Sequence, residues 1–522
     1  MKLARTVFII GGLLSSSLAH AFESNTVVNL DLATLEPIIS TAMEEFQIPG
    51  LAIAVVSRNQ LLLAKGYGVR DVDNQQPVTA ETLFGIASNT KAFTAAALAL
   101  LVDQGKLSWD DQVIRHLPEF QLFDPYASRE MTIRDLLSHR SGLGLGAGDL
   151  LIWPDTNKST AEIIAALRFI RPAHSFRAEY AYNNLMFLIA GEVIARVSGK
   201  SWHDFLEAEL LTPIGMRQTA ASFSRIAANN QNRAVGHIPM DQQLHRYPLD
   251  YLEDFRAAGA MASNVQDMSL WLRLQLANGL LPDGKRLFSA VQQQQMWKLH
   301  TPAAVSADSF KSTRQQFAGY GLGWVIDDYF GYKRVSHGGG ILGMVSQVTL
   351  IPEQQLGIVI LTNQQAFPAI NAISREIMEQ VLKLPERDWV SELATKYRSD
   401  RQKLYQKQGP AKLEHIQPAL PSSYYQVQLQ SDWYGNVSIQ ERAGKLRITF
   451  SHTPKLQGWL EHHSGHRFIV RWDDRLMEAD AYIDFEFDQN NKARRARMAL
   501  VNPDITDFSF DFHNLTLEAS SE

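Results

Sequence analysis

The spacing of apolar residues divides the chain into a mixed region and a tail of short strands. Helical periodicity is present over residues 31–46, 88–104, 132–138, 160–168, 185–198, 265–276 and 370–382. Strand-like apolar runs occupy residues 51–56, 60–67, 322–326, 333–335, 344–351 and 357–362. Strands therefore come first and last, with helices between them. This order predicts an α+β fold, in which an antiparallel sheet carries helices and a helical cluster lies beside it.

The tail begins after a charged stretch that contains Gly409-Pro410 and Pro418. Residues 389–406 of that stretch have helical character, and a linker follows them. Further strands are predicted at residues 424–430, 435–440, 446–450, 467–472, 481–487, 493–500 and 508–512. Short strands at even intervals indicate a small all-β barrel or sandwich. We therefore expect one domain over residues 22–385, a helical linker over 386–410 and a β domain over 411–522.

The N-terminus has the organisation of a secretory signal peptide. Lys2 and Arg5 precede an apolar run over residues 7–18, and Ala19-His20-Ala21 supplies a small-x-small cleavage site. We expect residues 1–21 to be removed and the mature protein to be exported across an inner membrane to the periplasm. A membrane anchor is the alternative. Because the run is shorter than the ~20 residues that a span requires, we expect no stable membrane insertion.

The composition limits the partners and cofactors. The 50 basic and 55 acidic residues give a net charge of −5, which argues against nucleic acid as a partner. The sequence contains no cysteine, which excludes disulfides, thiol catalysis and cysteine-bound zinc. His462, His463 and His466 lie together in the tail, but their spacing matches no metal site. We expect a hairpin loop there, and we predict neither a cofactor nor a metal.

The first candidates for catalysis are Ser88 and Lys91, at the head of a helix that is apolar on nearly all sides. The i, i+3 spacing puts both side chains on one face, a single turn apart. A buried lysine has a lowered pKa and can act as the base that a serine nucleophile needs. Such a pair also arises by chance, so it does not identify a site by itself.

Two further motifs carry groups that suit the same chemistry. Tyr182 precedes a predicted helix, and a tyrosine oxygen between two cations can ionise and act as a general base, while Asn184 can hold the substrate and the lysine. His337 follows a strand-like run and could act as a cation beside Tyr182, and Gly339 and Gly340 allow close approach of the backbone to a ligand. The backbone N–H groups of Ser88 and Gly340 could form an oxyanion hole.

Each of these motifs has a rival in the tail. Tyr434-Gly435-Asn436 repeats the tyrosine and asparagine spacing, and His463-Ser464-Gly465 repeats the histidine and glycine spacing. A core tyrosine and plain glycine turns are the structural alternatives at the first copies. Ser138 and His139 also suggest a serine–histidine pair, but adjacent helical residues do not face each other, so we interpret that pair as structural.

Taken in order, the three motifs resemble those of the penicillin-recognising serine hydrolases, specifically the class C β-lactamase-related group of D-aminopeptidases, DD-peptidases and esterases. Residues 132–143, 258–263 and 319–324 are also similar to segments of that group. The resemblance covers about residues 30–383 and implies the β-lactamase/transpeptidase-like fold. It implies Ser88 as nucleophile, Lys91 and Tyr182 as proton-transfer partners, and Asn184, His337, Gly339 and Gly340 as substrate-binding residues. The tail resembles the lipocalin-like β-barrel that follows many of these hydrolases.

The sequence departs from the family pattern at the third motif. Where the β-lactamases and penicillin-binding proteins have K-T-G, this chain has His337, Gly338 and Gly339. A weaker cation and a missing hydroxyl argue against an efficient β-lactamase. We expect an exported hydrolase that cleaves an amide or ester of a small molecule or short peptide, with a D-amino-acid peptide favoured. An esterase, a β-lactamase and a non-catalytic protein that binds peptidoglycan fragments are the alternatives.

Overall fold

The computed structural model describes residues 28–520, apart from 242, 250–252, 254 and 408–419. The predicted signal peptide and residues 408–410 at the end of the predicted helical linker lie outside the described residues, as do residues 411–419 at the start of the predicted β domain. No helix within the described ranges is long and apolar enough to cross a bilayer.

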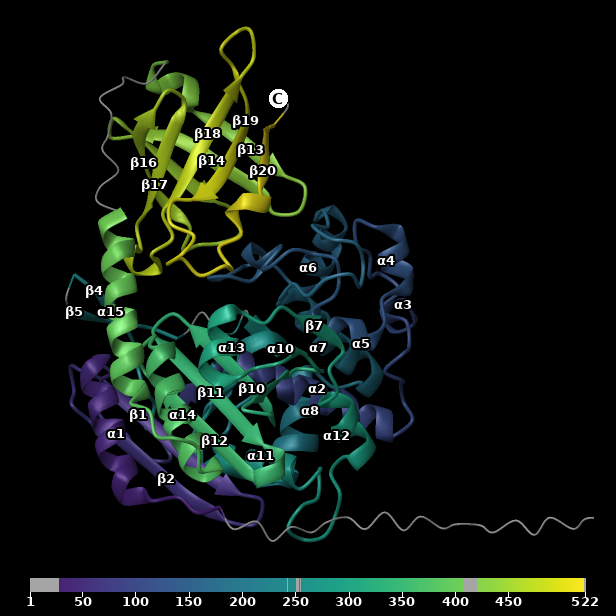
Figure 1. The fold of residues 1–522 in the computed structure, drawn as a ribbon. Coiled ribbons are helices and arrows are strands. Elements are labelled where there is room, and N and C mark those ends of the chain that lie inside the picture. Colours follow the sequence, from purple (N-terminus) through teal and green to yellow (C-terminus); the bar gives the residue numbers. More distant parts are fainter. Residues whose placement is uncertain (1–27, 242, 250–252, 254, 408–419, 521–522) are drawn as a thin grey trace, which may run out of the picture.

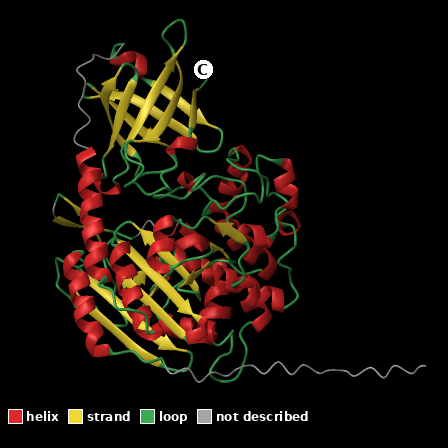
Figure 2. Ribbon diagram, viewed as in Figure 1, coloured by secondary structure: helices red, strands yellow, loops and turns green. Residues whose placement is uncertain are grey.

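The first domain combines helices and strands in the predicted order (Figures 1 and 2). Its helices are α1 (Leu32–Glu45), α2 (Thr90–Asp103), α3 (Val113–His116), α4 (Pro125–Glu130), α5 (Ile133–Leu136), α6 (Thr160–Ala166), α7 (Leu185–Ser198), α8 (Trp202–Leu206), α9 (Thr212–Ile214), α10 (Arg256–Gly259), α11 (Val265–Leu276), α12 (Ala290–Met296), α13 (Ala307–Thr313) and α14 (Phe367–Leu382), and α15 (Trp389–Lys407) leads to the tail. Its strands are β1 (Gly50–Ser57), β2 (Leu61–Gly68), β3 (Phe84–Gly85), β4 (Gly236–Met240), β5 (Gln243–Tyr247), β6 (Ala262–Ser263), β7 (Thr301–Ala303), β8 (Ala318–Tyr320), β9 (Val325–Tyr329), β10 (Tyr332–Ile341), β11 (Met344–Ile351) and β12 (Leu356–Thr362).

The central sheet is antiparallel, in the order β2-β1-β12-β11-β10-β9-β8-β7. Strand β1 shows why its sequence is apolar without alternation. Leu51, Ile53 and Val55 face one apolar core with α1 and α14, and the intervening residues face a second core with α2 and α11. A strand buried on both faces reads as a continuous apolar run. The predicted α+β fold, with helices on a sheet and a helical cluster at its side, is confirmed.

The tail is a closed antiparallel barrel of eight strands joined in chain order. The strands are β13 (Val427–Ser431), β14 (Gly435–Arg442), β15 (Lys445–Phe450), β16 (Gln457–Ser464), β17 (Arg467–Trp472), β18 (Ala481–Phe487), β19 (Ala493–Leu500) and β20 (Thr516–Ala519). The closed barrel confirms the predicted all-β domain and decides between barrel and sandwich. Up-and-down closure is the lipocalin type of architecture.

The strand predicted at residues 508–512 is wrong. That segment belongs to the loop between β19 and β20, and β16 is instead formed by residues 457–464, where no strand is predicted. The segment has the sequence pattern of a strand because Phe508, Phe510 and Phe512 alternate with polar residues. Phe510 and Phe512 are both buried. Phe512 stacks on Trp472 inside the barrel, with ring centroids 5.5 Å apart, and Phe510 packs against Trp153 of the first domain at 6.0 Å. The alternating phenylalanines therefore belong to a loop between two domains, in which residues 509–512 are all buried.

Helix α15 and the loops at one end of the barrel join the two domains (Figure 1). The helix packs against α1 and α14. The barrel residue His452 contacts Asn157 through its ring and its backbone, and Lys455 N donates to Asp155 Oδ1 at 3.3 Å. Tyr247 donates to Asp474 of the barrel at 2.8 Å. The barrel is thus docked on the first domain through both polar and aromatic contacts.

Candidate active site

Ser88 lies in the short 3-10 turn Ala87–Asn89 that connects β3 to α2. Every residue from Thr82 to Leu101 is buried except Ser88, which is half-buried. Ala87 has a φ of +49°, a left-handed conformation that is unfavourable for a residue with a Cβ. The turn is therefore held in a strained shape that keeps one hydroxyl accessible at the edge of a buried helix.

The amine of Lys91 is buried and has three oxygen neighbours. Its Nζ lies 3.0 Å from Ser88 Oγ, 2.7 Å from Asn184 Oδ1 and 2.8 Å from the carbonyl oxygen of Ala258. Burial lowers the pKa of Lys91 to about 7, although the nearby charge of Asp149 acts to raise it. A large fraction of the lysine is therefore neutral near neutral pH.

These three contacts determine where the lone pair of the neutral amine points. The carbonyl of Ala258 and Oδ1 of Asn184 can only accept hydrogen bonds, so they take the two N–H groups of the amine. The remaining direction, which is the lone pair, faces Ser88 Oγ. The Ser88 hydroxyl can then donate to the amine, which is the geometry of a general base beside its nucleophile.

Tyr182 completes the predicted trio, but its charge state differs from the expectation. Its hydroxyl hydrogen bonds with Ser88, and its ring centroid lies 4.9 Å from Lys91 Nζ. Burial raises the pKa of the phenol well above its ordinary value, and the hydrogen bond with Ser88 does not offset this. The tyrosine is therefore a neutral hydroxyl near pH 7, which suits a proton shuttle better than an ionised base.

His337 differs from the expectation in position and in charge. It lies within β10, not after a strand. Its Nδ1 is 2.6 Å from the Gly338 carbonyl oxygen and its Nε2 is 2.6 Å from the Tyr320 hydroxyl. Because the carbonyl only accepts, Nδ1 carries the proton and Nε2 accepts from Tyr320. Burial lowers the pKa of His337 to about 3, so the ring is neutral and is not the predicted cation.

Gly339 and Gly340 allow β10 to lie against the turn that carries Ser88. A Cβ on Gly339 would lie 2.4 Å from the Ile86 carbonyl oxygen and 3.0 Å from Ala87 Cβ. Only a glycine allows this approach, which places the strand directly beside Ser88. A Cβ on Gly340 would meet the ring of Phe367 at 3.0 Å. The participation of Gly340 in an oxyanion hole stays a prediction.

Several residues around the site were not among the predicted ones. Asp149, the first residue of the short 3-10 turn Asp149–Leu151, is buried and accepts a 2.7 Å hydrogen bond at Oδ2 from Asn184 Nδ2. Phe508 of the barrel domain has its ring centroid 5.9 Å from that of Tyr182. His139 is buried with its ring centroid 4.1 Å from that of Tyr182, so it packs against the site, and the structural interpretation of this residue stays a prediction. Asp149 follows alternating glycines without a recognisable motif, so no sequence signal marked it.

The rival motifs of the tail are structural. Tyr434 is buried in the barrel and donates to Thr453 at 2.8 Å. His463 lies near the end of β16, beside the turn to β17, which confirms the predicted hairpin. Among the described residues, no group of histidine, aspartate and glutamate side chains could hold a metal ion.

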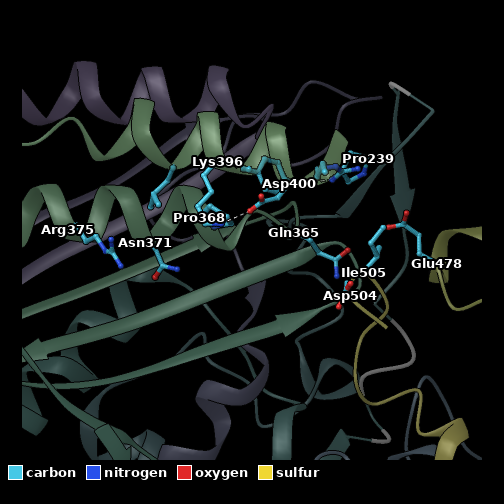
Figure 3. Close-up of a pocket in the computed structure, with 13 residues that line it drawn as sticks. Pro239, Gln365, Pro368, Asn371, Arg375, Lys396, Asp400, Glu478, Asp504 and Ile505 are labelled. Atoms are coloured by element: carbon cyan, nitrogen blue, oxygen red, sulfur yellow. Dashed lines mark hydrogen bonds and ion pairs between the residues drawn. The ribbon is translucent and has the colours of Figure 1, made fainter. Parts of the chain in front are cut away.

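A separate cavity of about 410 Å³ lies where α14 and α15 meet loops of the barrel (Figure 3). Its lining includes Arg375, Lys396, Asp400 and Asp504, and the Lys396–Asp400 ion pair spans 2.6 Å. None of the predicted catalytic residues lines it. The cavity is therefore distinct from the Ser88 site.

Comparison with known proteins agrees with this arrangement. Residues 35–382 match the family model described as Beta-lactamase. The chain belongs to the Beta-lactamase family. Residues 412–519 of this Beta-lactamase family member match a second model, described as a domain of unknown function, DUF3471, which corresponds to the barrel.

Relatives of this Beta-lactamase family member include proteins from fungi and bacteria. It is 31% identical over 337 residues to "Unguisins hydrolase ungD'" of Aspergillus campestris, a match that covers 62% of this chain and 60% of that protein. It is 28% identical over 330 residues to "Protein flp" of Staphylococcus aureus strain N315, a match that covers 63% of this chain and 62% of that protein. The matches thus span about three fifths of the length of these curated relatives.

Solved structures show the same fold. The octameric penicillin-binding protein homologue from Pyrococcus abyssi superposes with a TM-score of 0.60 at 21% identity, and the match covers 90% of this chain and 98% of that one. A class C beta lactamase from Rhodobacter sphaeroides superposes with a TM-score of 0.53 at 20% identity, over 67% of this chain and 98% of that one. The predicted β-lactamase/transpeptidase-like fold is confirmed.

Proposed function

We propose that the protein is a serine hydrolase that forms an acyl-enzyme on Ser88 and acts on an amide or ester bond. The observation that carries the proposal is the set of three contacts around Lys91, which directs the lone pair of a buried amine at the Ser88 hydroxyl. The family membership and the relative named as a hydrolase support the same chemistry.

The reaction follows from these contacts. Ser88 Oγ attacks the carbonyl carbon while its proton passes to Lys91 Nζ, and the backbone N–H groups of Ser88 and Gly340 hold the oxyanion that forms. When the intermediate collapses, the bond to the leaving group breaks and the proton reaches the leaving atom through the neutral hydroxyl of Tyr182. Water then attacks the acyl carbon and gives a proton to Lys91. The bond between the acyl carbon and Ser88 Oγ breaks, the acid leaves, and Lys91 returns the proton to Ser88 Oγ.

The third motif favours a substrate without a carboxylate at that position. His337 is neutral and both of its ring nitrogens are already hydrogen bonded, and Gly338 has no hydroxyl. A carboxylate, as in a β-lactam, would therefore lack a cationic partner here. We favour a short peptide with a D-residue over a β-lactam, and a simple ester is the second candidate.

The apolar start of the sequence supports export to the periplasm.

A panel of three chromogenic substrates tests this order of substrate preference. D-alanine p-nitroanilide, p-nitrophenyl acetate and nitrocefin would each be incubated with the native protein and with Ser88→Ala at matched concentration. We expect turnover of the anilide or the acetate that is lost in the variant, with the anilide preferred, and little turnover of nitrocefin. Fast nitrocefin turnover would contradict the argument from His337 and Gly338. Equal turnover by both proteins would contradict the assignment of Ser88.

A further inference from the structure

The Lys91 base is connected to the barrel domain by a short chain of buried hydrogen bonds. Lys91 Nζ donates to Asn184 Oδ1 at 2.7 Å, and Asn184 Nδ2 donates to Asp149 Oδ2 at 2.7 Å. Ser509 Oγ, from the loop between β19 and β20, donates to the same Asp149 oxygen at 2.9 Å. All four side chains have less than a tenth of their surface exposed. The chain thus runs from the base beside the nucleophile to a residue of the second domain.

We propose that Asp149 is a positioning residue that orients Asn184 and thereby the lone pair of Lys91, and that Ser509 of the barrel holds Asp149 in place. This inference rests on the proposed function, because it assigns a role toward the Lys91 base. It gives the barrel a part in catalysis without direct contact between Ser509 and the reacting atoms.

The orientation of Asn184 depends on what lies on each side of its amide. Oδ2 of Asp149 accepts hydrogen bonds, so it requires the NH₂ end of the amide to face it, and the oxygen then faces Lys91. If the amide turned over, its NH₂ group would face the amine of Lys91 and compete with Ser88 for the lone pair. Asp149 therefore selects the amide orientation that leaves the lone pair for Ser88.

Asp149 in turn has few contacts of its own. Among the described residues, Asn184 and Ser509 supply its side-chain hydrogen bonds, both at Oδ2, and Oδ1 is buried without a partner. Loss of Ser509 would therefore remove one of the two bonds that locate the carboxylate.

The barrel loop is anchored on both sides of this contact. Asp511 Oδ2 accepts a 2.6 Å hydrogen bond from Gly148 N, the residue before Asp149. Phe508 packs beside Tyr182, and a Cβ on Gly146 would lie 2.8 Å from the Phe508 ring, so the loop closely follows the surface below it. These contacts hold Ser509 at Asp149 with little freedom to move.

The charges that face this group come from both domains. Lys91 is the cation, Asp507 and Asp511 of the barrel are the further acids, and Tyr182, His139 and His337 are neutral because burial shifts the pKa of each away from its charged form. Burial raises the pKa of Asp149 to about 7, against the hydrogen bonds from Asn184 and Ser509 and the charge of Lys91. An ionised Asp149 stabilises protonated Lys91, so removal of its charge lowers the pKa of the base.

The test is the pH dependence of the rate at which a fluorophosphonate labels Ser88 in the full-length protein, followed by intact mass. We expect the native rate to rise through a midpoint near pH 7, where Lys91 loses its proton. Asp149→Asn keeps the shape and an acceptor oxygen but removes the charge, so its midpoint falls by about 0.5–1 pH unit. Asp149→Ala loses the acceptor, so its plateau rate falls about tenfold. Ser509→Ala lowers both the midpoint and the plateau rate, by smaller amounts than the Asp149 variants do. Ser509→Thr keeps the hydroxyl, so both values should equal those of the native protein.

Thr506→Val is the matched control, because it removes a buried hydroxyl of the same loop whose partner, the Glu478 carbonyl oxygen, lies within the barrel. Its profile should equal that of the native protein. If the native protein is labelled and all folded Asp149 and Ser509 variants keep its midpoint and plateau, the inference is wrong. Equal losses in Thr506→Val and Ser509→Ala, without a midpoint shift, would also contradict it. Absence of labelling in the native protein would instead overturn the proposed function, and the inference with it.

Discussion

Chemistry at the residue scale depends on where each proton resides at neutral pH. Lys91 is a buried amine with two acceptor oxygens and one hydroxyl around it, so its neutral form presents a lone pair to Ser88. Tyr182 and His337, which the sequence suggested as an ionised base and a cation, are both neutral because they are buried. Of these three residues, Lys91 is therefore the one that takes up the proton of Ser88.

Replacement of Lys91 tests this assignment. Lys91→Met keeps most of the side-chain volume but removes the base, so we expect kcat/KM with the preferred chromogenic substrate to fall by about 10²–10⁴-fold. In the native protein, kcat/KM should rise with pH through about 7, as Lys91 is deprotonated. Lys106→Met, at an exposed position just after α2, is the control and should leave both the rate and the pH profile unchanged. A Lys91→Met variant with near-native kcat/KM would show that another group is the base.

At the scale of elements, a buried carboxylate holds together the part of the chain that lies between Ser88 and Tyr182 in the sequence. Thr132 and Asp135 form a capping box at the start of α5, and Asp135 is completely buried. Arg140 Nε donates to it at 2.6 Å and Arg177 Nη2 at 2.6 Å. Burial alone would raise the pKa of Asp135, but the hydrogen bonds from Arg177 and Thr132 outweigh it and the pKa is lowered.

Asp135→Asn should therefore destabilise the fold. Two guanidinium groups lose their charged partner, and we expect the free energy of unfolding at pH 7 to fall by about 3 kcal/mol. Because the pKa in the folded state is depressed, the stabilisation is complete above the unfolded value and is lost as the pH falls through the folded value. The difference between native and variant in urea unfolding should thus shrink in acid. Asp110→Asn removes the partner of Arg134 at an exposed position, and we expect at most about 1 kcal/mol.

The elements themselves could largely be predicted, because periodicity is a local property. Helix α2 and strand β1 follow directly from apolar runs that are buried on all sides. The loop structure of segment 508–512 could not be predicted, because Phe510 and Phe512 are buried through contacts with Trp153 and Trp472, which are far away in the sequence.

Within the site, the proximity of Ser88 and Lys91 could be predicted from their spacing alone, because one helical turn brings the two side chains together. The roles of Asp149 and of Ser509 depend on how two domains pack, which no local pattern contains. The same holds for the charge state of His337, because burial within the fold determines it.

At the scale of the whole molecule, the two domains share one continuous apolar cluster. Phe510 of the barrel loop is completely buried and packs against Trp153 of the first domain, while Asp511 bonds to Gly148 beside it. Contacts of this kind make the barrel part of the same folded unit as the catalytic domain.

We therefore expect a single calorimetric unfolding transition for the full-length protein. Phe510→Ala leaves a cavity at the junction of the domains and should lower the free energy of unfolding by about 3–5 kcal/mol, while the transition stays single or begins to separate into two. Phe317→Ala, at an exposed phenylalanine of the first domain, is the control and should leave the transition temperature nearly unchanged. Two well-separated transitions in the native protein would contradict the shared core.

The central claim is that Ser88 is an activated nucleophile. The most direct measurement is the intact mass of the native protein and of Ser88→Ala after exposure to a fluorophosphonate. The account predicts one adduct on the native protein, located at Ser88 by peptide mass mapping, and none on the variant. A folded native protein that remains unlabelled, or a variant that is labelled equally, would contradict it.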